Sequence, residues 1–98
     1  MSVYLIAQIN IEDRDAYSRY ESGFSDIFSR YGGTILSVDE APETLEGSWV
    51  YTRTVLLEFP SESKALSWYH SPEYQDLARH RLASSSANIA MVKGLGRL

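Results

Sequence analysis

The chain has no cysteine among its 98 residues. Disulfides, metal sites built on thiolates and a cysteine nucleophile are therefore excluded. Basic residues are also scarce, because 9 lysines and arginines stand against 13 acidic residues and leave a formal net charge of −4. A chain with this balance repels a polyanion on average, so we predict no nucleic-acid partner.

Long hydrophobic runs are missing as well. The apolar stretch near the N-terminus, Val3 to Ala7, is too short to cross a bilayer and lacks the basic flank of a secretion signal. We therefore expect no membrane association and a cytoplasmic location. The 44% of apolar residues and 12% of aromatic residues are typical of a packed domain, and we assign residues 1–98 to one domain.

The hydrophobic pattern predicts four strands separated by helices. Apolar residues alternate at period two in the strands, whereas the first helix carries an aromatic stripe at three- and four-residue steps from Tyr17 to Tyr31. Asp13, Ser61 and Ser71 are expected helix caps, and Gly32-Gly33 is expected to end the first helix. The expected strands are residues 3–10, 34–39, 49–59 and 87–93, with a turn at 84–86.

The order of these elements is βαββαβ. It predicts a ferredoxin-like α+β fold, in which two helices pack on one face of a four-stranded antiparallel sheet. Both faces of the first and third strands carry apolar side chains. Leu56 and Leu57, for example, are adjacent in the third strand and therefore point to opposite faces. Because helices cover only one face, a second copy of the sheet is expected to cover the other, which predicts a homodimer through sheet faces.

Several short motifs, in this order and at this spacing, resemble a family of small bacterial proteins known as domain of unknown function 1330. They are "AY..Y" (16–20), "YGG" (31–33), "EG.W" (46–49), Arg53, "EFPS" (58–61), Ala65, "Y.SPEYQ" (69–75), Arg81 and "V.G" (92–94). The resemblance implies the dimeric α+β barrel fold and a homodimer. Members of that superfamily include cofactor-free monooxygenases, muconolactone isomerases and small-molecule binders, so the resemblance implies no cofactor.

Arg81 is the most informative charged residue of the last helix. It follows Leu77 by four residues and Tyr74 by seven, which places it on the apolar stripe of that helix. A guanidinium in that position needs an anion, a carbonyl or water as its partner. Glu58 and Glu73 are the candidate partners within the protein, and a ligand carboxylate is the alternative.

Other candidate ligand contacts lie on the third strand and the first helix. Arg53 is expected to share a strand face with Trp49 and Tyr51, where it would bind an anionic aromatic ligand, protect a sheet edge, or pair with Asp39 or Glu58 of a second copy. Aromatic residues of the first helix are expected in the core, where the hydroxyls of Tyr17 and Tyr20 would need partners.

The two histidines have no metal-site spacing, so we predict no metal. His70 differs from the family, which more often has asparagine there, and it is the candidate proton carrier if the protein is an enzyme. The first hypothesis is a binding domain for a small acidic or aromatic metabolite, with Arg81, Arg53, Trp49, Tyr74 and Tyr17 around the ligand. The alternatives are a cofactor-free enzyme, either isomerase or monooxygenase-like, and a purely structural dimer.

Overall fold

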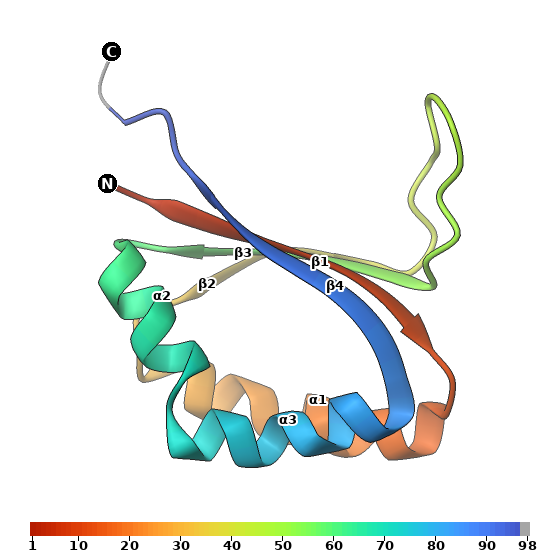
Figure 1. Ribbon diagram of the computed structural model, residues 1–98, viewed down its shortest axis with the longest axis horizontal. Helices are drawn as coiled ribbons and strands as arrows, with labels where there is room; N and C mark the ends of the chain where they lie inside the picture. Colours follow the sequence, from red (N-terminus) through yellow and green to blue (C-terminus); the bar gives the residue numbers. More distant parts are fainter. Residues whose placement is uncertain (97–98) are drawn as a thin grey trace.

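The structure, a computed structural model, describes residues 1–96 and has the expected ferredoxin-like architecture. One sheet forms a curved layer, and all three helices pack against the same face of it (Figure 1). The predicted order is confirmed, and the second helical segment is divided into two helices that start at the expected caps Ser61 and Ser71. The elements are β1 (Val3–Ile11), α1 (Arg14–Ser29), β2 (Thr34–Asp39), β3 (Arg53–Phe59), α2 (Glu62–Tyr69), α3 (Pro72–Ser84) and β4 (Ser85–Lys93).

The sheet is antiparallel throughout, with the strand order β2-β3-β1-β4. β1 lies between β3 and β4, and its residues alternate between buried positions facing the helices and partly exposed positions on the outer face. Direct pairing carries this alternation across the sheet, because residues opposite one another share a face. Leu5, for example, pairs with Leu57 on one side and with Met91 on the other.

The helices begin at the residues that capping chemistry predicts. The carboxylate of Asp13 accepts a hydrogen bond from the amide of Ala16, and the hydroxyl of Ser61 accepts one from the amide of Lys64. α1 ends at Ser29, earlier than the aromatic stripe suggests, and Gly32 follows with a φ of +80°. That left-handed conformation favours glycine and turns the chain into β2.

Two expected boundaries are wrong. The third strand begins at Arg53 rather than at residue 49, because β2 ends at Asp39, opposite Thr54, and offers no partner to residues 49–52. The expected turn at residues 84–86 is also absent. Ser84 ends α3 and β4 begins at the next residue, while the backbone carbonyl of Ser84 accepts from the amides of residues 12 and 13.

Aromatic rings fill much of the space between the helices and the sheet. Phe28 packs edge-on against Phe59, with ring centroids 5.1 Å apart, and Trp68 lies 4.2 Å from Tyr74 by the same measure. Such tilted and edge-on contacts add to the apolar area that the rings bury. The core therefore joins all three helices to the inner face of the sheet.

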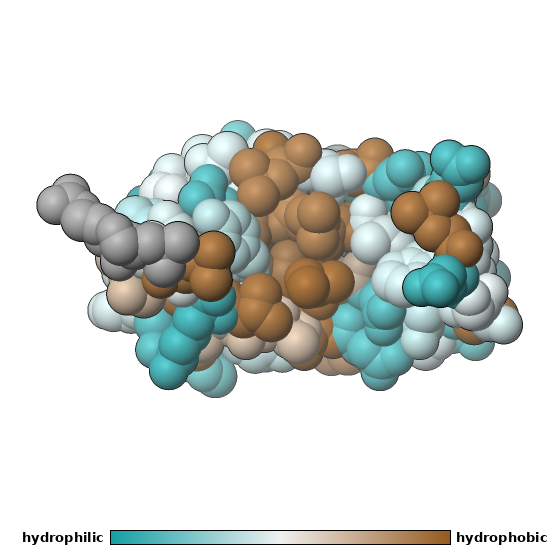
Figure 2. Space-filling view, turned by 90° about the horizontal axis from the view of Figure 1, so that it is seen from above, coloured by the Kyte–Doolittle hydropathy of each residue, from teal (hydrophilic) through white to brown (hydrophobic). Residues whose placement is uncertain are grey.

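The outer face of the sheet is apolar at its centre. Figure 2, viewed from the side opposite the helices, shows an apolar band crossing the sheet between two more polar regions. Ile6 lies opposite Leu56 on one side and Ala90 on the other. Leu56 retains 36% of its exposed surface and Val92 retains 42%. No helix covers this face within the described residues.

None of the helices formed by residues 1–96 is both long enough and apolar enough to cross a membrane.

Candidate functional site

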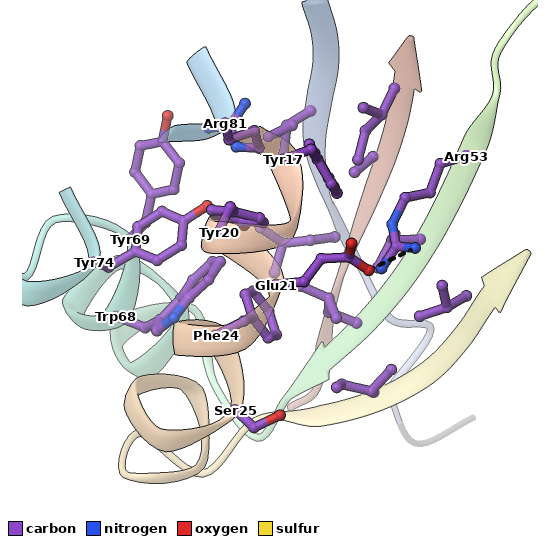
Figure 3. A pocket seen from close by; sticks show the side chains of 18 residues that line it. Tyr17, Tyr20, Glu21, Phe24, Ser25, Arg53, Trp68, Tyr69, Tyr74 and Arg81 are labelled. Atoms are coloured by element: carbon purple, nitrogen blue, oxygen red, sulfur yellow. Dashed lines mark hydrogen bonds and ion pairs between the residues drawn. The ribbon is translucent and has the colours of Figure 1, made fainter. Parts of the chain in front are cut away.

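A cavity of about 170 Å³ lies between the helices and the inner face of the sheet. α1 forms one wall, α2 and α3 contribute a second, and side chains from all four strands close the space (Figure 3). The lining residues are Leu5, Ala7, Ile9, Tyr17, Tyr20, Glu21, Phe24, Ser25, Ile35, Val38, Arg53, Val55, Leu57, Trp68, Tyr69, Tyr74, Arg81 and Ile89.

An irregularity in β2 shapes the cavity wall. The register with β3 shifts between Ile35 and Ser37, so that Ile35 pairs with Leu57 while Val38 pairs with Val55. Both β2 side chains therefore share the inner face, although a regular strand would place residues three apart on opposite faces. Ile35 is 44% exposed and Val38 is 46% exposed, which indicates that the cavity is open along this edge strand.

Arg81 is a buried part of the cavity wall. Its neighbours on the same helix face, Tyr74 and Ala78, are also buried, and Arg81 retains only 5% of its exposed surface. No carboxylate lies within 4 Å of its guanidinium in residues 1–96. The expected partner Glu73 instead lies 3.7 Å from Arg30.

The immediate surroundings of Arg81 are aromatic. Its guanidinium carbon lies 5.7 Å from the centroid of the Tyr20 ring, within the range of a cation–π contact. Burial lowers the pKa of Arg81, but the nearby phenols of Tyr74 and Tyr20 outweigh that effect, so the pKa is raised. The side chain therefore keeps its positive charge inside the protein.

The hydroxyls of Tyr20 and Tyr74 bond to each other beside Arg81. The two oxygens are 2.8 Å apart, and both residues are buried. Burial is the main reason that the pKa of Tyr20 is raised well above its usual value. The two hydroxyls share one hydrogen bond, so one O–H donates to its neighbour while the other O–H remains a donor for a further group.

Arg53 lies in the same wall, but its charge is compensated by two carboxylates. One nitrogen, Nη1, is 3.2 Å from a carboxylate oxygen of Glu21 and 3.0 Å from one of Glu40. Glu40 also pairs with Arg14 at 2.8 Å, and hydrogen bonds from Arg14 and Arg53 lower the pKa of the Glu40 carboxyl. The network joins α1, β3 and the segment after β2, and the partners of Arg53 belong to its own chain.

Three buried side-chain nitrogens have no hydrogen-bond partner in the described part of the chain. They are Nε of Arg53, Nε1 of Trp68 and Nε of Arg81. All three are donors, and all three residues line the cavity. Because buried polar groups are rarely left unpaired, this arrangement calls for a group that supplies acceptors.

Four of the five predicted ligand contacts line the cavity: Arg81, Arg53, Tyr74 and Tyr17. Trp49 does not, because its indole nitrogen donates to the hydroxyl of Thr54 at 2.9 Å on the other face of β3. The sequence suggested that Trp49 shares a strand face with Arg53, and this expectation is wrong.

The proton-carrier candidate His70 is also outside the cavity. It is exposed at the end of α2, and His80 is exposed on α3. Within residues 1–96 no group of three or more histidine, aspartate or glutamate side chains is placed to hold a metal ion.

Trp68 and Glu21 are two of the wall residues that sequence reasoning did not find. Trp68 belongs to the apolar positions of the short helix after Ser61, a pattern that indicates burial but not a cavity. Glu21 follows Tyr20 on the first helix and has no local signal, because its partner Arg53 is distant in the sequence.

A family model described as "Domain of unknown function (DUF1330)" matches residues 2–95. No curated protein matches the chain. Among solved structures, a protein of unknown function from Rhodopseudomonas palustris is 17% identical, with a TM-score of 0.82, and the match covers 98% of this chain and 84% of that one.

Two further solved structures resemble the chain along nearly its whole length. A dimeric ferredoxin-like protein of unknown function from a Jannaschia species is 14% identical, with a TM-score of 0.76 and coverage of 96% of this chain and 100% of the other. SnoaB, a cofactor-independent oxygenase from Streptomyces nogalater, is 15% identical, with a TM-score of 0.65 and coverage of 99% and 96%. At these identities the likeness shows a shared fold.

Proposed function

We propose, from the premise that this chain belongs to the DUF1330 family, that it binds a small organic anion in the cavity between its helices and its sheet. The observation that carries this proposal is Arg81. Its guanidinium is buried in the cavity wall, and no carboxylate of residues 1–96 pairs with it. A buried charge without a partner is costly, and a ligand carboxylate would compensate it with two parallel hydrogen bonds.

The rest of the wall supports an apolar body attached to that acid group. Leu5, Leu57, Val55 and Phe24 offer no hydrogen bonds, while Trp68 adds an aromatic ring and an unpaired N–H donor. A cavity with an apolar lining and a few converging polar groups is typical of small-molecule sites. These features support an aromatic or compact aliphatic acid as the ligand.

The test is calorimetric titration with benzoate, comparing the unchanged protein with Arg81→Leu. A hydrogen bond to a charged group contributes about 1.5–3 kcal/mol, so we expect Arg81→Leu to weaken benzoate binding by about 10- to 100-fold. The fold should survive, because the substitution leaves no carboxylate of residues 1–96 without its partner.

Arg79→Leu provides the matched control. Arg79 is on the same helix, but its side chain is 78% exposed and its partner is Asp76 on the surface. This variant removes the same charge without touching the cavity, so benzoate affinity should change by less than about twofold. Binding that is equally strong in the Arg81→Leu protein, or absent from the unchanged protein at 10 mM benzoate, would contradict the proposal.

A second candidate function is cofactor-independent catalysis on the same ligand. It is favoured by the fold shared with SnoaB, described as a cofactor-independent oxygenase, and by the Tyr20–Tyr74 hydroxyl pair, which is placed to donate a proton inside the cavity. Tyr74→Phe should then abolish turnover of a metabolite mixture followed by mass spectrometry while benzoate binding persists. If the unchanged protein alters no component of the mixture, the catalytic function is contradicted and only the binding function remains.

The second sheet face supports a homodimer. The uncovered apolar band includes Ile6, Leu56 and Val92, and similar structures from Jannaschia and Bacteroides fragilis are described as dimeric. The outer face of a second copy would cover this band, because a two-fold symmetric contact uses the same surface patch on both subunits. We therefore include a dimer through sheet faces in the proposal.

A further inference from the structure

The charges in the cavity wall are compensated at one end and not at the other. Only three charged residues of the described chain line the cavity: Glu21, Arg53 and Arg81. Arg53 is within 3.2 Å of Glu21 and within 3.0 Å of Glu40, which lies outside the wall. Arg81 has no such partner in residues 1–96, so the wall carries one uncompensated positive charge.

Two tyrosine rings separate the two arginines. The Arg53 guanidinium lies 5.5 Å from the ring centroid of Tyr17, and the Arg81 guanidinium lies 5.7 Å from that of Tyr20. The two rings are themselves 5.5 Å apart. Figure 3 shows Arg81 and the Arg53–Glu21 pair in different parts of the wall, with Tyr17 between them. A ligand therefore meets two distinct polar ends.

The end at Arg53 is suited to a neutral polar group. Nε of Arg53 is a buried donor without a partner, while the Glu21 carboxylate beside it is an acceptor whose side chain retains 35% of its exposed surface. An amide or hydroxyl matches both, since it accepts from Arg53 and donates to Glu21. A second carboxylate on the ligand would instead face Glu21, and like charges in a partly buried site repel one another.

The volume limits the ligand that links the two ends. A dry cavity of about 150 Å³ is enough to hold benzene. The cavity here measures about 170 Å³ and is open along β2, so a single ring fits, with a substituent reaching the opening.

We propose that the cavity selects a monoanion over a dianion: the ligand carries one acid group, held by Arg81, and an uncharged hydrogen-bonding group at the Arg53–Glu21 end. This inference rests on the proposed function, because it assumes that Arg81 holds the acid. It adds that Glu21 determines specificity by excluding a second negative charge.

The experiment compares 4-carbamoylbenzoate with terephthalate by calorimetric titration. The two compounds have nearly the same size and shape, and they differ in whether the second group is a neutral amide or a carboxylate. In the unchanged protein we expect 4-carbamoylbenzoate to bind at least tenfold more tightly. Glu21→Gln removes the repelling charge while keeping the shape of the side chain, so the preference should fall below about threefold, mainly through tighter binding of terephthalate.

Glu46→Gln is the control for net charge. Glu46 is exposed in the segment between β2 and β3 and does not line the cavity. The Glu46→Gln substitution removes the same formal charge as Glu21→Gln, and the tenfold preference for 4-carbamoylbenzoate should remain. The inference is overturned if terephthalate binds the unchanged protein as tightly as 4-carbamoylbenzoate, if Glu21→Gln leaves the preference intact, or if Glu46→Gln removes it equally.

Benzoate separates this inference from the proposed function. If benzoate binds through Arg81 but neither para-substituted compound binds, the Arg53–Glu21 end does not take a ligand group and only this inference fails. If benzoate fails to bind as well, the proposed function fails with it.

Discussion

Arg81 and Arg53 show how two identical side chains in one cavity take different roles. Both are always charged, and both line the same space. Arg53 is held by Glu21 and Glu40 and so connects α1, β3 and the segment after β2. Arg81 has the phenols of Tyr20 and Tyr74 near its charge, and in the proposed function a ligand carboxylate compensates that charge.

Tyr20 provides a prediction about alkaline stability. Its pKa is raised well above the usual value near 10 by burial first and by the neighbouring Tyr74 second, so the folded state holds the phenolic proton more tightly than the unfolded state. The resulting stability is fully present below the unfolded pKa, near 10, and is lost as the pH rises from there toward the folded pKa. We expect the free energy of unfolding to fall above about pH 10.

Urea unfolding monitored between pH 8 and pH 11.5 checks this expectation. Tyr20→Phe should be less stable at pH 8, because Tyr74 loses its hydroxyl partner, and it should lose less stability as the pH rises. Tyr31→Phe serves as the control, because the Tyr31 hydroxyl is exposed beside Glu73 of α3, away from the Tyr20–Tyr74 pair, and this variant should keep the slope of the unchanged protein. Equal slopes in the unchanged and Tyr20→Phe proteins would count against the prediction.

At the scale of elements, Ser71 joins α2 to α3. Its hydroxyl donates to the carbonyl of Trp68 at 2.8 Å and accepts from the amide of Tyr74 at 3.1 Å, and the residue is buried. It thereby connects the backbone of two residues that line the cavity, and Pro72 fixes the first turn of α3.

Ser71→Ala should lower the free energy of unfolding by about 1–2 kcal/mol, because a helix cap and a buried hydrogen bond are lost together. Ser67→Ala is the control, since Ser67 is exposed within α2 and its replacement should change stability by less than about 0.5 kcal/mol. Urea denaturation at one fixed protein concentration measures both variants. Equal effects of the two substitutions would show that the cap is unimportant.

At the scale of the whole molecule, we expect a dimer in solution, formed by contact between the outer sheet faces of two copies. Light scattering after gel filtration should give twice the chain mass of 11.1 kDa at micromolar concentration. Stable obligate dimers bury roughly 2,000 Å² or more, so the proposed contact has to involve much of the outer face of the sheet. A mass of one chain would show that the outer face is free.

Ile6→Lys should dissociate the dimer, because it places a charge at the centre of the apolar band, between Leu56 and Ala90. Leu82→Lys introduces the same charge on the helical side of the molecule, where Leu82 is already 66% exposed, and should leave the mass unchanged. Dissociation by both variants would indicate general destabilisation rather than loss of this interface.

The sequence alone determined the elements and their order. Alternation along β1, the aromatic stripe of α1 and the caps at Asp13, Ser61 and Ser71 depend on neighbours a few residues apart, so the chain records them locally. The burial of Arg81 could also be predicted, because helical spacing fixes its face relative to Tyr74.

Only the tertiary structure decided which groups meet in the cavity. Strand pairing made β3 begin at Arg53 and left Trp49 on the other face, while packing of α1 against β3 gave Arg53 its partner Glu21. The bulge in β2 and the wall position of Trp68 likewise follow from pairing and packing between distant segments. Such contacts depend on register and helix placement, which are set by the free energy of the whole core rather than by any short stretch of sequence.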